Sequence, residues 1–329
     1  MTATKDLVLG VDLGGTNTSF GLVDRSGRCL ARGTMATDSR FPVTHFFQRL
    51  HENSQALLAG LTGEHALAGI GIGAPDANHF TGTIEHPPNL EWDFVDVPSE
   101  LARYYPVPVA VTNDAKAVAL GEMLFGAAKG MQDFIAITLG TGLGSGIVVN
   151  GELVYGYDGL AGEMGHLAVT HRSDRECGCG RVGCLETYAS ATGIVRTVLE
   201  LMANRRAPSA LSQVPSHKLT AKLIFEAAQN QDALAREAFE VTGRVLGAKL
   251  ADMVLLNRPQ AIILFGGLTE AGDMIFDPTR RSMDASLPAD CRGKVPLLPS
   301  AFNGSEAAIL GAGALIWTEL QGKVPSAGG

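Results

Sequence analysis

Three cysteines and one histidine in the middle of the chain have the spacing of a metal site. Cys177, Cys179 and Cys184 fall within eight residues, and ten residues separate His166 from Cys177. One imidazole nitrogen and three thiolates make a closed tetrahedral zinc site, which leaves no open position for chemistry. We therefore expect these four residues to hold a structural Zn²⁺ ion, with His171 competing with His166 as the fourth ligand.

Two glutamates, Glu163 and Glu186, bracket this predicted metal site. A metal between acidic residues indicates a loop that is stapled so that it holds polar groups in place. The remaining cysteines, Cys29 and Cys291, are isolated and are expected to be buried as small apolar side chains. The alternative for the three clustered cysteines is that they too are only buried apolar side chains. The glycines at 178, 180 and 183 disfavour it, because they stand where a metal-binding loop turns tightly.

Two glycine-rich turns each lie between short apolar runs. The first is Asp12-Leu-Gly-Gly-Thr-Asn17, and the second contains Gly140-Thr-Gly142. Glycines let backbone N–H groups converge on an anionic oxygen, and threonine hydroxyls add donors. Both turns are therefore predicted to bind phosphate, and Asp12 adds a carboxylate for a phosphate-bound Mg²⁺. The alternative is that both are hairpin turns without a ligand. A further glycine pair, Gly266-Gly267, follows another apolar run and disfavours this alternative.

Asn113 and Asp114 stand between an apolar run and an alanine-rich helical pattern. A carboxylate at such a junction can accept the proton of an attacking hydroxyl. Asparagine and aspartate also cap helices well, so a helix N-cap is the alternative. Because the same chain carries two predicted phosphate turns and a metal-stapled pair of glutamates, the catalytic interpretation is favoured.

The elements that must position these residues alternate between strands and helices. Strand, glycine turn and strand occur at 7–23 and again at 134–149, a weak duplication that indicates two similarly built domains facing each other. Helices are expected at 42–58, 115–125, 191–204, 219–230, 233–257 and 305–320, and further strands at 28–34, 68–72, 107–111 and 261–265. The stretch 207–216 has the composition of a loop. The 329 residues suffice for two domains, and the alternation predicts an α/β fold.

Composition and motifs exclude several classes of function. The chain has no G-x-x-x-x-G-K-[ST] motif, and its second glycine turn returns into a strand, which is the wrong context for a Rossmann site. A net charge of −8 without a Lys/Arg-dense run argues against nucleic acid as a partner. No apolar run is long enough to span a bilayer. Five cysteines with a metal-like cluster fit a reducing compartment, so we expect a cytoplasmic protein.

Four stretches together resemble the ROK family, which groups bacterial sugar kinases with related transcriptional repressors. They are Asp12–Asn17, Asn113-Asp114-Ala, Glu163-Met-Gly-His166 and Cys177-Gly-Cys-Gly-Arg-Val-Gly-Cys184-Leu-Glu186. The resemblance covers residues 7 to about 320 and implies the fold of the actin, hexokinase and Hsp70 superfamily, with two ribonuclease H-like domains around a cleft. We expect residues 1–120 plus 305–320 to form the smaller domain, and residues 121–304 the larger one with the zinc-binding loop.

The resemblance also implies roles for individual residues. Asp114 matches the base that deprotonates the sugar hydroxyl, and His166 matches a ligand of both zinc and sugar. The residues assigned to the sugar are Asn89, Asn113, Asp114, Glu163, His166 and Glu186. Those assigned to ATP and its Mg²⁺ are Asp12, Gly14, Gly15, Thr16, Asn17, Thr141, Gly142, Gly266 and Gly267.

The implied reaction is the ATP-dependent phosphorylation of a hexose, with glucose to glucose 6-phosphate as the leading expectation. Fructose, mannose or an N-acetylhexosamine as substrate, and polyphosphate as donor, stay open. A repressor or a non-catalytic sugar-responsive regulator is the alternative class. Family repressors carry an N-terminal helix-turn-helix domain, for which a first strand at Leu7 leaves no room. A homodimer or homotetramer is expected.

Two positions depart from the family pattern. The family usually has asparagine where Lys116 stands and glycine where Asp76 stands. Lys116 is expected either to face solvent or to touch the phosphate, because it lies two residues past Asp114. Asp76 is expected to add a carboxylate near the sugar.

Overall fold

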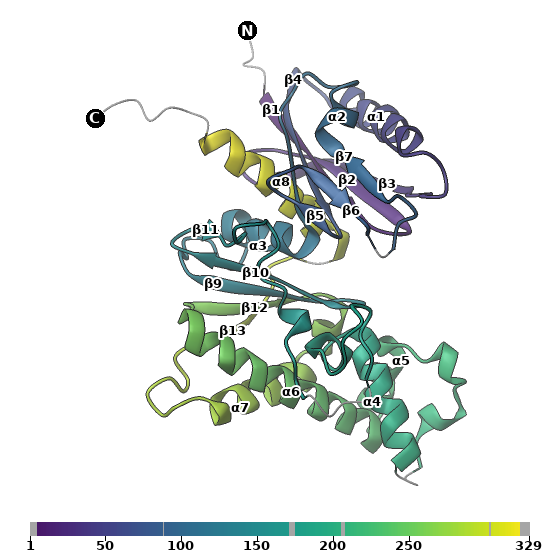
Figure 1. Ribbon diagram of the computed structural model, residues 1–329, viewed down its shortest axis with the longest axis vertical. Helices are drawn as coiled ribbons and strands as arrows, with labels where there is room; N and C mark the ends of the chain where they lie inside the picture. Colours follow the sequence, from purple (N-terminus) through teal and green to yellow (C-terminus); the bar gives the residue numbers. More distant parts are fainter. Residues whose placement is uncertain (1–4, 88, 171–174, 205–207, 303, 323–329) are drawn as a thin grey trace.

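A computed structural model describes residues 5–87, 89–170, 175–204, 208–302 and 304–322, and two five-stranded sheets form its frame (Figure 1). The first sheet contains β1 (Lys5–Leu13), β2 (Asn17–Val23), β3 (Cys29–Ala36), β4 (His65–Ala74) and β8 (Val109–Asn113). The second contains β9 (Phe134–Leu139), β10 (Leu143–Val149), β11 (Glu152–Leu153), β12 (Ala261–Phe265) and β13 (Leu297–Pro299). Their strand orders are β3-β2-β1-β4-β8 and β11-β10-β9-β12-β13.

Both sheets are built on the same plan. β1 pairs antiparallel with β2 and parallel with β4, and β9 pairs antiparallel with β10 and parallel with β12. In each sheet one of the two glycine-rich turns joins the antiparallel pair, because glycine permits the tight reversal. The predicted α/β fold with two similarly built halves is therefore confirmed.

Helices cover the sheets and fill the space between them (Figure 1). They are α1 (Val43–Ala59), α2 (Val97–Leu101), α3 (Asp114–Phe125), α4 (Ala191–Asn204), α5 (Ala221–Gln229), α6 (Ala233–Asn257), α7 (Asp273–Ser286) and α8 (Gly304–Gly322). α8 packs on the first sheet, α3 packs on β9 and β10 of the second, and the two helices pack on each other. The α4–α7 group lies on the far side of the second sheet.

Glycines let the central helices approach their neighbours at backbone distance. A Cβ atom at Gly71 of β4 would stand 1.8 Å from the carbonyl oxygen of Ala312 in α8. A Cβ atom at Gly311 of α8 would stand 2.5 Å from the carbonyl oxygen of Ala117 in α3. Because neither position has room for a side chain, the first sheet, α8 and α3 form one close stack.

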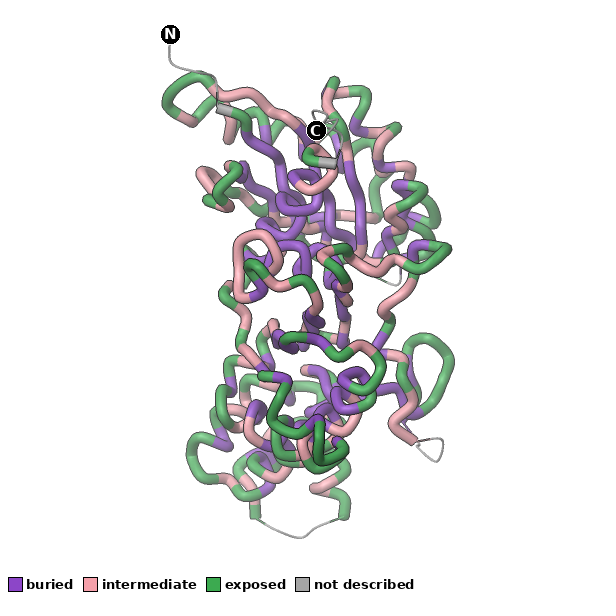
Figure 2. The backbone as a smooth tube through the Cα atoms, turned by 90° about the vertical axis from the view of Figure 1, so that its left-hand side faces the viewer, coloured by how far each residue is buried: buried purple, intermediate pink, exposed green. Residues whose placement is uncertain are grey.

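Each half also has its own apolar core. One cluster includes Leu9, Phe46 and Ile72 beneath the first sheet, and another includes Ile137 and Leu246 beneath the second. In Figure 2 the buried segments run through the centre of each half, while exposed segments follow the outer loops. Among the described residues, no helix combines the length and the hydrophobicity needed to cross a bilayer.

The structure differs from the sequence prediction in several elements. β10 begins at Leu143 rather than at 147, because Gly144 and Gly146 belong to the strand, where their lack of a side chain admits α3. The polar helix α7, which contains Pro278, was not expected, and neither was β13. A small sheet of β5 (Ala77–Asn78), β6 (Thr83–Glu85) and β7 (Phe94–Asp96) was also missed.

Short 3-10 helices shape the loops of the second half. They are η1 (Met164–His166), η2 (Leu185–Thr187), η3 (Ala210–Gln213), η4 (Ser216–Lys218) and η5 (Gly267–Ala271). One of them, η3, interrupts the stretch 207–216 that was expected to be a loop, and η4 begins at its last residue.

Candidate active site

A cavity of about 360 Å³ lies between the two halves of the molecule. The first half contributes Asp12, Leu13, Gly14, Gly15, Pro75, Asn89, Asn113 and Asp114 to its wall. The second half contributes Thr138, Gly140, Thr141, Gly142, Leu143, Gly144, Glu163, His166 and Glu186. Residues assigned to the sugar and to the phosphates thus share one cavity, although they come from distant parts of the sequence. Thr16 and Asn17 are exposed beside it, outside its lining.

Asn113 and Asp114 have different positions at the junction of β8 and α3. Asn113 is the N-cap of α3, and its Oδ1 accepts a hydrogen bond of 2.9 Å from the backbone N–H of Ala115. Asp114 is the first helical residue, and its Oδ1 accepts from the same N–H at 2.7 Å. Asp114 is exposed and lines the cavity, but the surrounding protein desolvates its carboxyl and raises its pKa, and the charge of Asp76 adds to the effect.

Asp12 lies near the end of β1 and lines the same cavity. Burial raises its pKa from 3.8 to about 7, and the neighbouring charge of Asp114 contributes to the rise. Two carboxylates that repel each other in a partly desolvated cleft favour a cation between or beside them. The pair therefore fits a hard divalent ion, although it is only part of the six-oxygen shell that Mg²⁺ needs.

The two glycine turns lie close to other walls of the cavity. A Cβ atom at Gly15 would stand 2.6 Å from the carbonyl oxygen of Asn89, and one at Gly142 would stand 2.7 Å from Oε2 of Glu186. Gly140, by contrast, has open space where a side chain would be. Each turn therefore brings bare backbone against a residue assigned to the sugar.

Neither Gly266 nor Gly267 lines the first cavity, and Gly267 lines a second one of about 400 Å³. Its wall consists of Ala191, Ala221, Lys222, Phe225, Glu226, Gln229, Phe239, Gly267, Leu268, Glu270 and Ala271. It adjoins the second glycine turn, because a Cβ atom at Gly266 would stand 2.6 Å from the carbonyl oxygen of Leu139. The mixture of apolar floor and polar rim suits a flat heteroaromatic ring.

The α5 part of this second wall was not identified from the sequence. Lys222, Phe225, Glu226 and Gln229 recur at three- and four-residue spacing, so they lie on one face of α5. That periodicity is visible in the sequence, but it is equally typical of an ordinary surface helix. Only the position of α5 beside η5 turns this face into the wall of a cavity.

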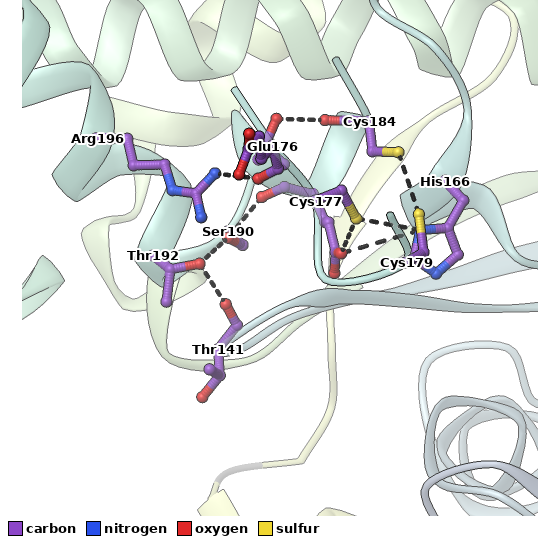
Figure 3. Close-up of polar contacts among 11 residues, drawn as sticks. Thr141, His166, Glu176, Cys177, Cys179, Cys184, Ser190, Thr192 and Arg196 are labelled. Carbon is purple, nitrogen blue, oxygen red and sulfur yellow. Dashed lines mark hydrogen bonds and ion pairs between the residues drawn. The ribbon is translucent and has the colours of Figure 1, made fainter. Parts of the chain in front are cut away.

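The cysteine cluster has the dimensions of a metal site (Figure 3). Ligand atoms of His166, Cys177, Cys179 and Cys184 all lie within 4.8 Å of one another. The Sγ atoms of Cys179 and Cys184 are 3.8 Å apart, and Sγ of Cys177 is 3.6 Å from Nδ1 of His166. A tetrahedral zinc site with Zn–S bonds of about 2.3 Å separates its sulfur atoms by about 3.8 Å, so the donors fit Zn²⁺. His171, the competing ligand, lies outside the described residues.

The cluster is joined directly to the sugar side and to the second glycine turn. Sγ of Cys177 is 2.8 Å from Oε1 of Glu186, which lines the first cavity. Next to η2, the backbone N–H of Ala191 donates to the carbonyl oxygen of Gly140 at 2.8 Å. The hydroxyl of Thr192 donates to the carbonyl oxygen of Thr141 at 2.9 Å (Figure 3). A change in the cluster would therefore reach both Glu186 and the second glycine turn.

Lys116 corrects one expectation, because it neither faces solvent nor lines the phosphate turns. Its side chain is 1% exposed, and Nζ donates a hydrogen bond of 2.8 Å to the carbonyl oxygen of Gly159. Asp76 is exposed just past β4 and does not line the cavity, yet its charge helps to raise the pKa of Asp114 and of Glu163. Asp76 therefore contributes to the electrostatic field at the site.

Two similar α/β halves around an acidic, glycine-walled cleft define a fold of the actin and hexokinase class. A sequence profile of the ROK family matches residues 8–319, and the chain belongs to this family.

Known relatives include both enzymes and regulators. A glucokinase from Halalkalibacterium halodurans is 35% identical over 315 residues, which are 94% of this chain and 94% of that protein. The solved structure of a ROK glucokinase from Streptomyces griseus, in complex with glucose and AMPPNP, matches with a TM-score of 0.78 and 34% identity over 94% of this chain and 98% of that one. A ROK transcriptional regulator, described as a homologue of the E. coli MLC protein, matches with a TM-score of 0.83 and 26% identity over 96% of this chain and 81% of that one. Similarity of fold therefore does not distinguish a kinase from a regulator.

Proposed function

We propose that this chain is an ATP-dependent hexose kinase that converts glucose to glucose 6-phosphate. The observation that carries the proposal is the position of Asp114, a carboxyl with a raised pKa in one cavity with both glycine turns and the residues assigned to the sugar. Phosphoryl transfer needs a base between an aligned hydroxyl and an aligned phosphate. The similarity to glucokinases supports glucose as the acceptor.

In this proposal the sugar binds in the cavity between the two halves. Asn89, Asn113, Glu163, His166 and Glu186 hydrogen-bond the hydroxyls of the ring. Asp114 accepts the proton of the 6-hydroxyl as that oxygen attacks the γ-phosphate of ATP. Since Asn113 already caps α3, Asp114 is not needed as the cap and is available for this reaction.

The nucleotide is proposed to bind with its phosphates between the two glycine turns and its adenosine on the second half. Gly14, Gly15, Thr16 and Asn17 of the first turn and Thr141 and Gly142 of the second would donate to its phosphates. Its adenosine would occupy the cavity beside Gly266, Gly267 and α5. Asp12 would hold Mg²⁺, which neutralises phosphate charge when bound.

Zinc has a structural role in this proposal. Four protein ligands leave no position for an activated water. His166, Cys177, Cys179 and Cys184 would instead fix the loop that presents Glu186 to the cavity.

A sugar-responsive regulator is the second candidate, because the regulator structure matches this fold at least as well as the glucokinase structure does. The two candidates differ in turnover. We expect a kinase to release ADP, which a coupled assay measures. Glucose should give the fastest release in a panel that also includes fructose, mannose, N-acetylglucosamine and N-acetylmannosamine. Polyphosphate replaces ATP in a parallel arm. If calorimetry shows that a sugar binds, but there is neither ADP release nor phosphorylation from polyphosphate, the protein is a regulator instead.

A further inference from the structure

Lys116 is a buried cation that neither lines the two glycine turns nor faces solvent. It lies two residues after Asp114 in α3, and its side chain is 1% exposed. A buried ammonium is costly unless a partner satisfies its donors. Here the partners are the carbonyl oxygen of Gly159, at 2.8 Å from Nζ, and the ring of Tyr155, whose centroid lies 5.7 Å from Nζ.

Both partners belong to the segment 155–162, which directly precedes Glu163. The segment has neither helix nor strand, and its glycines at 156, 159 and 162 all have positive φ. Such a backbone has many alternative conformations available to it. Its conformation therefore depends on contacts with other elements, and those contacts decide where Glu163 stands.

Three sets of contacts hold the segment. Nδ2 of Asn78 in β5 donates to the carbonyl oxygen of Asp158 at 2.7 Å. The rings of His79 and Tyr155 stack at a centroid distance of 4.1 Å. At the other end, the hydroxyl of Ser145 in β10 donates to the carbonyl oxygen of Gly162. Lys116 reaches the middle of the segment, between the contacts with the first half and the contact with β10.

We propose that Lys116 is a positioning residue for the sugar site: its ammonium group fixes Gly159, and the segment 155–162 then holds Glu163 beside Asp114. The inference rests on the proposed function, because it assumes that Glu163 binds the sugar. A long side chain with a terminal cation suits the position. It spans from α3 to the segment. Burial lowers the pKa of its ammonium group, and the carboxylates of Glu163 and Asp158 oppose that shift.

The first test is hydrogen–deuterium exchange of the full-length protein without ligands. Lys116→Met removes the donor but keeps most of the volume, and Lys129→Met makes the same change at an exposed lysine just past α3. We expect peptides covering 155–163 to exchange at least about tenfold faster in the first variant, with β9 and the cysteine cluster unchanged. The Lys129 variant should exchange like the wild type.

The second test separates positioning from folding. Lys116→Met should raise the KM for glucose about tenfold while kcat and the KM for ATP change much less, because only the sugar site loses a contact. Lys116→Asn is a second variant with a side chain too short to reach Gly159, and it should behave in the same way. A purely structural role would lower the melting temperature and leave the KM for glucose unchanged.

Two outcomes would overturn the proposal. One is unchanged exchange of 155–163 in both variants, and the other is faster exchange of this segment with an unchanged KM for glucose. Failure of the proposed function looks different, because the wild type would then phosphorylate no hexose while the exchange result would still stand.

Discussion

At the scale of single residues, the site depends on carboxylates that keep protons more strongly than usual. Desolvation is the main cause of the raised pKa values of Asp12, Asp114 and Glu163, and repulsion from neighbouring carboxylates, Asp76 among them, adds to it. A base with a raised pKa binds the proton of a sugar hydroxyl better, provided that it is ionised at the working pH. This property separates Asp114 from Asn113, which caps the same helix without titrating.

Replacing Asp114 tests its role as the base. We expect Asp114→Asn to lower kcat by a factor of about 10²–10⁴, because the amide cannot accept the hydroxyl proton. The KM for glucose should change little, since asparagine keeps the shape of the side chain. Steady-state kinetics at pH 8 with a matched glucose titration by calorimetry measure both quantities. A near-normal kcat would mean that the base lies elsewhere.

Asp12 predicts a pH dependence of stability in the ligand-free protein. Its pKa is about 7 in the fold and 3.8 without it, so folding favours the protonated form. Its contribution to the free energy of unfolding is therefore fully present below pH 3.8 and is lost as the pH rises through 7. Each pKa unit corresponds to about 1.4 kcal/mol.

We accordingly expect Asp12→Asn to raise the melting temperature more at pH 8 than at pH 5, because the amide never carries the buried charge. Calorimetric melting of both proteins without nucleotide and Mg²⁺ measures the difference. Asp133→Asn, just before the start of β9, is the control, because Asp133 does not line the cavity. The same gain at both pH values would show that Asp12 keeps an ordinary pKa.

The functional residues were easier to predict from the sequence than their neighbours in space. Asp12 and Asp114 were identified separately from their local turns, but their mutual repulsion requires β1 and β8 to end in one cleft. Lys116 was misplaced for a related reason. Its partner Gly159 belongs to a segment without regular structure, so no periodicity links the two.

At the scale of elements, the cysteine cluster connects the second half to the cleft. Cys184 directly precedes η2, which carries Glu186, and the following residues anchor the second glycine turn. A metal here would order several short elements that contain little regular hydrogen bonding of their own.

We expect Cys184→Ser to lose zinc, with a stability loss of about 2 kcal/mol and a melting temperature lower by roughly 6 °C. The affinity for glucose should fall as well, because Glu186 loses its support. Elemental analysis and thermal melting check the two effects. Cys291→Ser is the matched control, since Cys291 is also buried but lies far from the cluster in the sequence. Equal zinc content in the wild type and in Cys184→Ser would rule out the proposed ligand set.

Elements with strong periodicity were predicted well, and weakly patterned ones were not. α6 and α8 stand near their expected ranges, because long apolar faces leave few alternatives. α7 was missed because its sequence is polar and contains Pro278, although the helix is stabilised by packing on α6. The strands β5, β6 and β7 have only two or three residues each, too few for an alternating pattern.

At the scale of the whole molecule, α3 and α8 form the connection between the halves. A further link joins Glu122 of α3 to Ser300, just after β13, through the hydroxyl of Ser300. We propose that residues 1–120 plus 305–320 form one domain and residues 121–304 the other. In this division α3 crosses the boundary, so a small change at α3 would tilt one sheet relative to the other.

This arrangement predicts that sugar binding closes the cleft. Asn89 and Asn113 line it from the first half, and Glu163 and Glu186 line it from the second, so one hexose can satisfy both walls only if they approach. Closure would also remove water from Asp114 and protect ATP from hydrolysis. We expect saturating glucose to reduce the radius of gyration in small-angle scattering. Asp114→Asn should close in the same way, because it keeps the sugar contacts. Superimposable profiles, with calorimetry showing that glucose is bound, would mean that the cleft is already rigid.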